Sequence, residues 1–167
     1  VLVADTNVQD FPSPKRLVNV SKSCVRVARL FGFDPKVAFL SHSTFGKPIS
    51  KNTKHVRDAI ELLKSEKVDF DFDGEMQPDV ALNPIYQEVY PFSKIVGNAN
   101  ILIMPALHSA AISTKLMKVF GGGKLIGPLL IGLGLPIEVA PLRSSTSDIL
   151  HLASIAAYSS DRIEYSS

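Results

Sequence analysis

The stretch NILIMP, residues 100–105, decides the fold class of this chain. Its uninterrupted apolar residues are typical of a short strand that is buried on both faces of a parallel sheet. Apolar residues then recur with helical spacing, at Ile112, Leu116, Val119 and Phe120. Gly121 ends the helix that this spacing predicts. A buried strand that leads into a helix is the building unit of α/β proteins.

The same unit occurs twice before this stretch. Residues 1–4 and the stretch VAFLS, residues 37–41, predict two further buried strands. A helix between them begins at Ser13, a good N-cap residue, with Pro14 at the first helical position. Cys24 lies on the apolar face of this helix, and no neighbour would lower the pKa of its thiol. We therefore expect Cys24 to be a core residue.

Further elements follow the same alternation. A helix that begins at Asn52 or Thr53 is expected to bury Val56, Ala59, Ile60 and Leu63. Strands are predicted at residues 68–74, 125–133 and 136–140. A last helix, at about residues 147–157, has one apolar face made by Ile149, Leu152, Ala153 and Ala156. The sequence thus predicts a three-layer αβα fold with a mostly parallel sheet between helices.

Composition excludes several classes of protein. The chain is 46% apolar with a net charge of +2 and a pI near 8.7, which is neither disordered nor basic enough to indicate a nucleic-acid partner. A single cysteine allows no internal disulfide and fits the cytoplasm. The longest apolar run, residues 125–140, is interrupted by glycine and proline, so no membrane span or signal peptide is expected. The chain begins inside an apolar run, which suggests a fragment of a longer polypeptide.

Polar residues directly after the predicted strands are the candidate ligand-binding groups, because α/β folds bind ligands at the carboxyl ends of their strands. The loop SHSTFGK offers Ser41, Ser43, Thr44 and Lys47. Backbone N–H groups, hydroxyls and a lysine suit a phosphate, although the Walker A spacing is absent. The simpler alternative is a polar loop between strand and helix. Other strand ends supply Pro105, Arg143, Ser144 and Ser145.

The stretch DFDGEMQPDVAL, residues 69–80, is rich in carboxylates. The first three aspartates alternate with apolar residues, so they share one strand face and are not expected to converge on a metal ion. Asp73 and Glu75 are expected at the rim of a cleft, and Pro78 at the start of a short helix. The four histidines lie far apart in the sequence, and no metal site is expected.

Asp148 is the candidate catalytic base. It could take a proton from a thiol or hydroxyl at a strand-to-helix junction. Ser145 and Asp148 also have the spacing of a capping box ahead of an apolar helix. The residues alone favour the capping role over the catalytic one.

Several motifs in one order resemble the C-terminal half of the phosphate acetyltransferase (phosphotransacetylase) module. They are VLVADTNVQDFPS, ARLFGFDPKVAFLSHSTFGKP, DFDGEMQPDVAL, NANILIMP, IGPLLIGLGLPIEV and SDI. The details DGEMQPDVALNP, YPFS and LHLASIAA are similar to one branch, the phosphotransacetylase-like C-terminal domain of bacterial NADP-dependent malic enzymes.

The resemblance implies a partial two-lobed fold, similar to isocitrate and isopropylmalate dehydrogenases. Residues 1–167 would form a dimerising lobe, to about residue 120, and a segment from about residue 121 that returns to the other lobe. Coenzyme A or acetyl-CoA would bind between the lobes. The domain itself would need no cofactor, whereas NADP and a divalent metal would belong to upstream malic enzyme domains.

The chain departs from the pattern of active members of the family. These resemble one another in a Ser-Arg-Gly run before the aspartate that aligns with Asp148, and here Pro141, Leu142 and Arg143 stand in those places. An arginine that would hold an anion is thus replaced by an aliphatic side chain. Active members also resemble one another in Pro-Asp-Leu and Gly-Asn runs, where this chain has Pro105-Ala106-Leu107 and Ala110-Ala111.

The resemblance therefore implies a domain that binds acetyl-CoA or a related acyl-CoA, regulates a malic enzyme and assembles it as a homodimer or larger oligomer. An active phosphate acetyltransferase is the alternative. A third hypothesis is that the domain is a structural remnant that only holds subunits together.

Overall fold

The computed structural model describes residues 1–121, 124–133 and 135–160. The chain divides into two compact units, Val1–Thr114 and Lys115–Ser167. No helix in these described ranges is long and apolar enough to cross a membrane.

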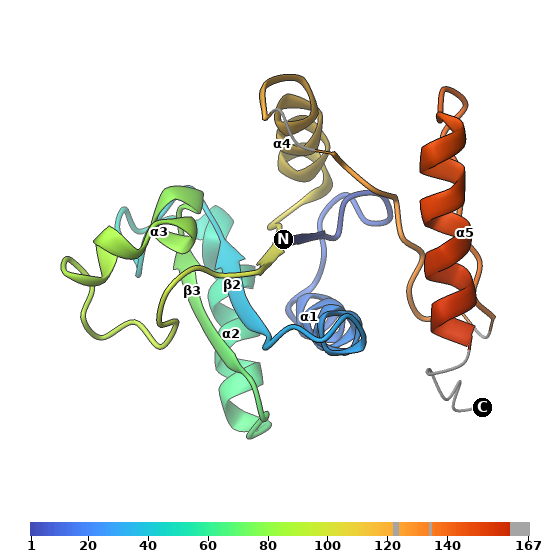
Figure 1. The fold of residues 1–167 in the computed structure, drawn as a ribbon. Coiled ribbons are helices and arrows are strands. Elements are labelled where there is room, and N and C mark those ends of the chain that lie inside the picture. Colours follow the sequence, from blue (N-terminus) through green and yellow to red (C-terminus); the bar gives the residue numbers. More distant parts are fainter. Residues whose placement is uncertain (122–123, 134, 161–167) are drawn as a thin grey trace. The chain divides into compact units, whose positions relative to one another are not determined.

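The first unit is built on a parallel sheet (Figure 1). Within the described residues its four strands are β1 (Leu2–Ala4), β2 (Lys36–Leu40), β3 (Asp71–Met76) and β4 (Ile101–Ile103). Their order is β1-β4-β2-β3, and every adjacent pair is parallel. All three residues of β4 are buried, as the apolar stretch NILIMP predicts. The predicted α/β class with a parallel sheet is confirmed.

Two long helices cover one face of this sheet. They are α1 (Pro14–Leu30) and α2 (Lys54–Ser65), whose buried residues share one core cluster with Val37, Phe39, Ile101 and Ile103. The predicted start of α1 is confirmed, because the Ser13 side chain accepts a hydrogen bond from the backbone N–H of Arg16. A short 3-10 turn, η1 (Lys51–Thr53), leads into α2, and Thr53 stands at the N-cap position.

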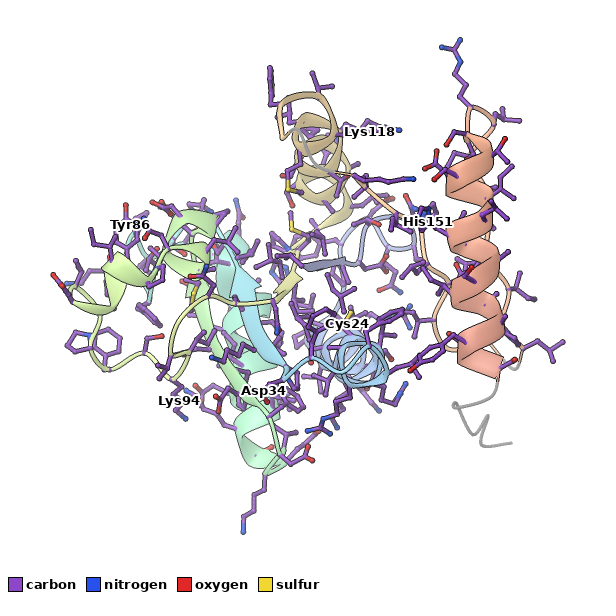
Figure 2. The ribbon with its side chains drawn as sticks, in the orientation of Figure 1. Cys24, Asp34, Tyr86, Lys94, Lys118 and His151 are labelled. Atoms are coloured by element: carbon purple, nitrogen blue, oxygen red, sulfur yellow. The ribbon has the colours of Figure 1, made fainter. Side chains whose placement is uncertain are left out.

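Cys24 belongs to this first core cluster, as its position on the apolar helix face predicts. Only 2% of the residue is exposed. Burial raises the pKa of its thiol to about 12. Figure 2 labels Cys24 on α1.

A second core cluster covers the other face of the sheet. It joins Ala38, Leu40, Leu102 and Met104 to Ala81 of α3 (Pro78–Leu82) and Ala110 of α4 (Leu107–Phe120). The predicted helix start at Pro78 is confirmed. A 3-10 turn, η2 (Pro84–Gln87), follows α3. The sheet therefore has side chains packed on both faces, which is what its apolar strands require.

Strand β3 differs from the prediction. The sequence pattern predicts a strand at residues 68–74, whereas β3 begins at Asp71 and continues to Met76. Gly74 pairs with Phe39 and Met76 pairs with Leu40, so Glu75 is an extra residue in the ladder. Such a bulge reverses the alternation of side chains beyond it. Phe72 accordingly lies in the first core cluster and Met76 in the second.

In the second unit, the strands predicted at residues 125–133 and 136–140 do not form among the described residues. The described residues there form only an isolated antiparallel bridge between Leu129 and Glu138. Gly127 and Gly132 adopt φ values of 133° and 88°, which do not suit a regular strand. Proline at 128 and 136 removes two ladder donors as well. The strand prediction was therefore wrong here, because it relied on apolar composition alone.

The last helix is confirmed as α5 (Thr146–Ser160), but its expected apolar face is not buried as a whole. Leu152 is the buried residue of that face, while Ile149 is half exposed. The face expected on α4 is also exposed, at Ile112, Leu116, Val119 and Phe120. Helical periodicity thus predicted both helices correctly, but it did not predict which of their residues are buried.

Candidate ligand-binding loop and its buried support

The loop that follows β2 contains a tight turn. Thr44 and Lys47 exchange two backbone hydrogen bonds, with N···O distances of 2.9 and 3.0 Å. The two central residues, Phe45 and Gly46, have positive φ values of 48° and 82°. Positive φ at both central positions is typical of a type I′ turn. The turn presents the Lys47 side chain on the surface.

Beneath this turn, the hydroxyls of the loop are used inside the protein. The Oγ atoms of Ser41 and Ser43 lie 3.1 Å apart, and Ser43 Oγ donates to Glu75 Oε1 at 2.7 Å. Glu75 is 1% exposed, and Ser43 is fully buried. The sequence placed Glu75 at the rim of a cleft, whereas the structure places its carboxylate underneath the loop. The bulge at Glu75 causes this, because it turns the carboxylate toward α2.

Arg57 of α2 completes the buried network. Its Nη1 atom lies 3.0 and 3.1 Å from the two oxygens of Glu75 and donates to Thr53 Oγ1 at 2.6 Å. Its Nη2 atom donates to the carbonyl of Ser50 at 2.9 Å. A buried carboxylate is costly unless it is paired and hydrogen-bonded, and Arg57 with Ser43 supplies both requirements. Sequence analysis missed Arg57, whose only local signal is a position four residues after Thr53.

Additional hydrogen bonds hold the turn against β3 and α3. The N–H of Phe45 donates to the carbonyl of Glu75 at 2.7 Å. The backbone N–H of Gln77 donates to Thr44 Oγ1 at 3.2 Å, and its side-chain amide donates to the carbonyl of His42 at 2.8 Å. The loop is therefore tied to its neighbours at several points and is preorganised.

Two other predicted site residues, one within β3 and one shortly after β4, make structural contacts. The carboxylate of Asp73 accepts hydrogen bonds from the N–H of Gly74 at 2.9 Å and of Lys94 at 2.7 Å. The carbonyl of Pro105 lies 2.8 Å from Nε2 of His55. These contacts connect β3 to the segment around Lys94, and the residues after β4 to α2.

The remaining predicted residues belong to the second unit. Ser145 and Asp148 form a reciprocal capping box at the start of α5, with 2.9 Å from Ser145 N to Asp148 Oδ2 and 3.2 Å from Asp148 N to Ser145 Oγ. Lys124 Nζ lies 3.1 Å from Asp148 Oδ1. Hydrogen bonds from Ser145 and Lys124 lower the pKa of Asp148 to about 2. Arg143 is exposed, and Ser144 donates its N–H to the carbonyl of Pro141.

The structure thus brings most of the predicted residues together in two groups, which Asp73, Pro105, Arg143 and Ser144 do not join. Ser41, Ser43, Thr44, Lys47 and Glu75 form one group in the first unit, and Ser145 with Asp148 forms another in the second.

Comparison with known proteins now identifies the family. Residues 1–157 match the model of the phosphate acetyl/butaryl transferase family. The chain belongs to this family. It is 46% identical over 158 residues to an NADP-dependent malic enzyme of Rhizobium meliloti, a match that covers 95% of this chain and 21% of that protein. It is 32% identical to the phosphate acetyltransferase of Bacillus subtilis, covering 92% of this chain and 48% of that one.

Solved structures agree with this assignment. A phosphotransacetylase from Streptococcus pyogenes matches with a TM-score of 0.89 and 33% identity, covering 96% of this chain and 49% of that one. The EutD phosphotransacetylase from Staphylococcus aureus matches with a TM-score of 0.86 and 31% identity, over 95% of this chain and 49% of its own. The chain spans about half of the phosphotransacetylases and about a fifth of the malic enzymes that it matches. It is homologous to both, and its fold is consistent with part of the αβα module.

Proposed function

We propose that this chain is the phosphotransacetylase-like domain of an NADP-dependent malic enzyme, and that it binds acetyl-CoA or a related acyl-CoA as a regulatory ligand. The full-length enzyme would decarboxylate malate oxidatively to pyruvate. The observation that carries this proposal is the 46% identity to a malic enzyme over 95% of the chain, against 32% to a phosphate acetyltransferase.

Two features argue against acetyl transfer by this domain. Leu142 stands where the family pattern has an arginine, and an aliphatic side chain cannot neutralise phosphate. Asp148 has a pKa of about 2 because Ser145 and Lys124 stabilise its ionised form. A carboxylate with so low a pKa is a weak acceptor for the proton of a thiol, whose ordinary pKa is about 8.5.

The same proposal includes assembly into a homodimer or larger oligomer. Helix α4 exposes several large apolar side chains, at Ile112, Leu116, Val119 and Phe120. Apolar surface gathered in one segment is typical of an interaction site. In this proposal the domain itself needs no cofactor, and NADP and a divalent metal act in the upstream malic enzyme domains.

Malic enzyme activity of the full-length protein, measured with and without acetyl-CoA, tests the regulatory role. We expect the rate to change with acetyl-CoA concentration and calorimetry to show binding. No heat and no change in rate would favour a purely structural role. A phosphate-dependent release of coenzyme A from acetyl-CoA would instead support the alternative, an active acetyltransferase.

A further inference from the structure

A groove beside the turn at residues 44–47 has the features of a ligand site. Its volume is about 380 Å³, within the roughly 300–1,000 Å³ typical of small-molecule pockets. It lies beyond the carboxyl ends of β2 and β3, where α/β folds bind ligands. The turn, α3 with its N-cap, and the segment at residues 86–92 supply its walls.

One wall of the groove is aromatic. The ring centroid of Phe45 lies 4.9 Å from that of Phe92 and 5.3 Å from that of Tyr90. Phe92 is 64% exposed, so part of this aromatic surface faces solvent. Tyr86, labelled in Figure 2, also lines the groove. Exposed aromatic rings stack readily on planar heteroaromatic rings.

The groove also has an exposed cation. Lys47 is exposed and forms no ion pair or side-chain hydrogen bond with the part of the chain that the structure describes. An ammonium group of this kind is a common phosphate ligand. Gln77 and Asp79 supply polar groups that can accept a hydrogen bond from a ring amino group, and Asp79 also accepts one from Tyr86.

The position of Lys47 is preorganised. Both backbone hydrogen bonds of the turn, and the buried contacts of Ser43 and Arg57 with Glu75, hold the loop before any ligand arrives. A ligand would therefore pay little for ordering the backbone around Lys47.

We propose that this groove binds a planar heteroaromatic ring that carries a phosphate group, with the ring on Phe45, Tyr90 and Phe92 and the phosphate at Lys47. Resting on the function proposed above, the groove is the subsite for the nucleotide end of the acyl-CoA. A free nucleotide has the same chemistry and is the other source of such a ligand.

Calorimetric titration of the full-length protein with acetyl-CoA, and separately with AMP, tests the proposal. We expect Lys47→Ala to weaken binding at least tenfold and Phe92→Ala to weaken it several-fold. Lys15→Ala and Phe33→Ala remove an exposed lysine and an exposed phenylalanine remote from the groove, and should leave affinity unchanged. Circular dichroism verifies that each variant is folded.

The outcomes separate the two proposals. If AMP binds in a manner that depends on Lys47 and Phe92 while acetyl-CoA does not bind, the groove is a nucleotide site and the acyl-CoA function is wrong. If acetyl-CoA binds equally well to wild type and both groove variants, the groove proposal is overturned and the acyl-CoA function stands. If neither compound binds to the wild-type protein, both proposals fail.

Discussion

Arg57 and Glu75 form an ion pair that joins α2 to the end of β3, with Nη1 of Arg57 at 3.0 and 3.1 Å from the two carboxylate oxygens. The Glu75 side chain is fully buried, while a third of the Arg57 side chain is exposed. Through Ser43, the same carboxylate supports the loop that carries Lys47. This pair makes the loop part of the folded core.

We expect Arg57→Met to lower the free energy of unfolding by about 3 kcal/mol, because it leaves a buried carboxylate without its counter-charge. The value is at the lower end of the usual range because solvent reaches part of Arg57. Urea denaturation measures the change. Lys54→Met, which breaks the exposed pair with Asp58, is the control and should cost less than about 1 kcal/mol. Equal stability of the two variants would show that the buried pair is not important.

Gly74→Ala should destabilise the protein by at least about 2 kcal/mol, because its backbone conformation and its surroundings both require glycine. Gly74 has a φ of 145°, and an added Cβ would lie 2.7 Å from the carbonyl oxygen of Phe39. Gly32→Ala is a matched control, with a positive φ of 77° but no atom within 4 Å of the added Cβ. It should cost about 1 kcal/mol from backbone strain alone. Thermal denaturation compares the two, and a similar loss would exclude the steric clash.

Acid should loosen the start of α5 as Asp148 becomes protonated. The pKa of Asp148 is lowered to about 2, so its contribution to stability is complete above the ordinary aspartate pKa, near 3.9, and is lost as the pH falls toward 2. Circular dichroism against pH should show this loss in wild type and a smaller change in Asp148→Asn. Lys124→Met removes one group that lowers this pKa, so the loss should be smaller and should be complete at a higher pH. Identical profiles for all three proteins would contradict the capping role.

Cys24 should not react with thiol reagents in the folded protein at pH 8. Its thiol is buried, and its pKa is raised to about 12, so almost no reactive thiolate is present. Colour development with Ellman's reagent should be negligible until guanidinium chloride unfolds the chain, and one thiol per chain should then react. Rapid reaction without denaturant would show that α1 opens readily.

Local sequence patterns predicted much of the first unit because its signals are local. A run of apolar residues at 100–105 indicates a strand buried on both faces, and Ser13 before Pro14 indicates a helix start. The same reasoning failed at residues 125–140, where apolar composition competed with the backbone preferences of glycine and proline. It also could not tell which helix faces would be covered, since burial depends on what packs against them.

By itself, the sequence determined the α/β class, the main strands and helices of the first unit, and the family to which the chain belongs. Only the tertiary structure decided that Glu75 is buried, that Arg57 is its partner 18 residues away, and that Phe45, Tyr90 and Phe92 gather beside Lys47. The physical reason is that helix caps and apolar runs act between neighbours in the chain. Charge pairing and aromatic packing depend on distances in space, which a one-residue bulge in β3 is enough to change.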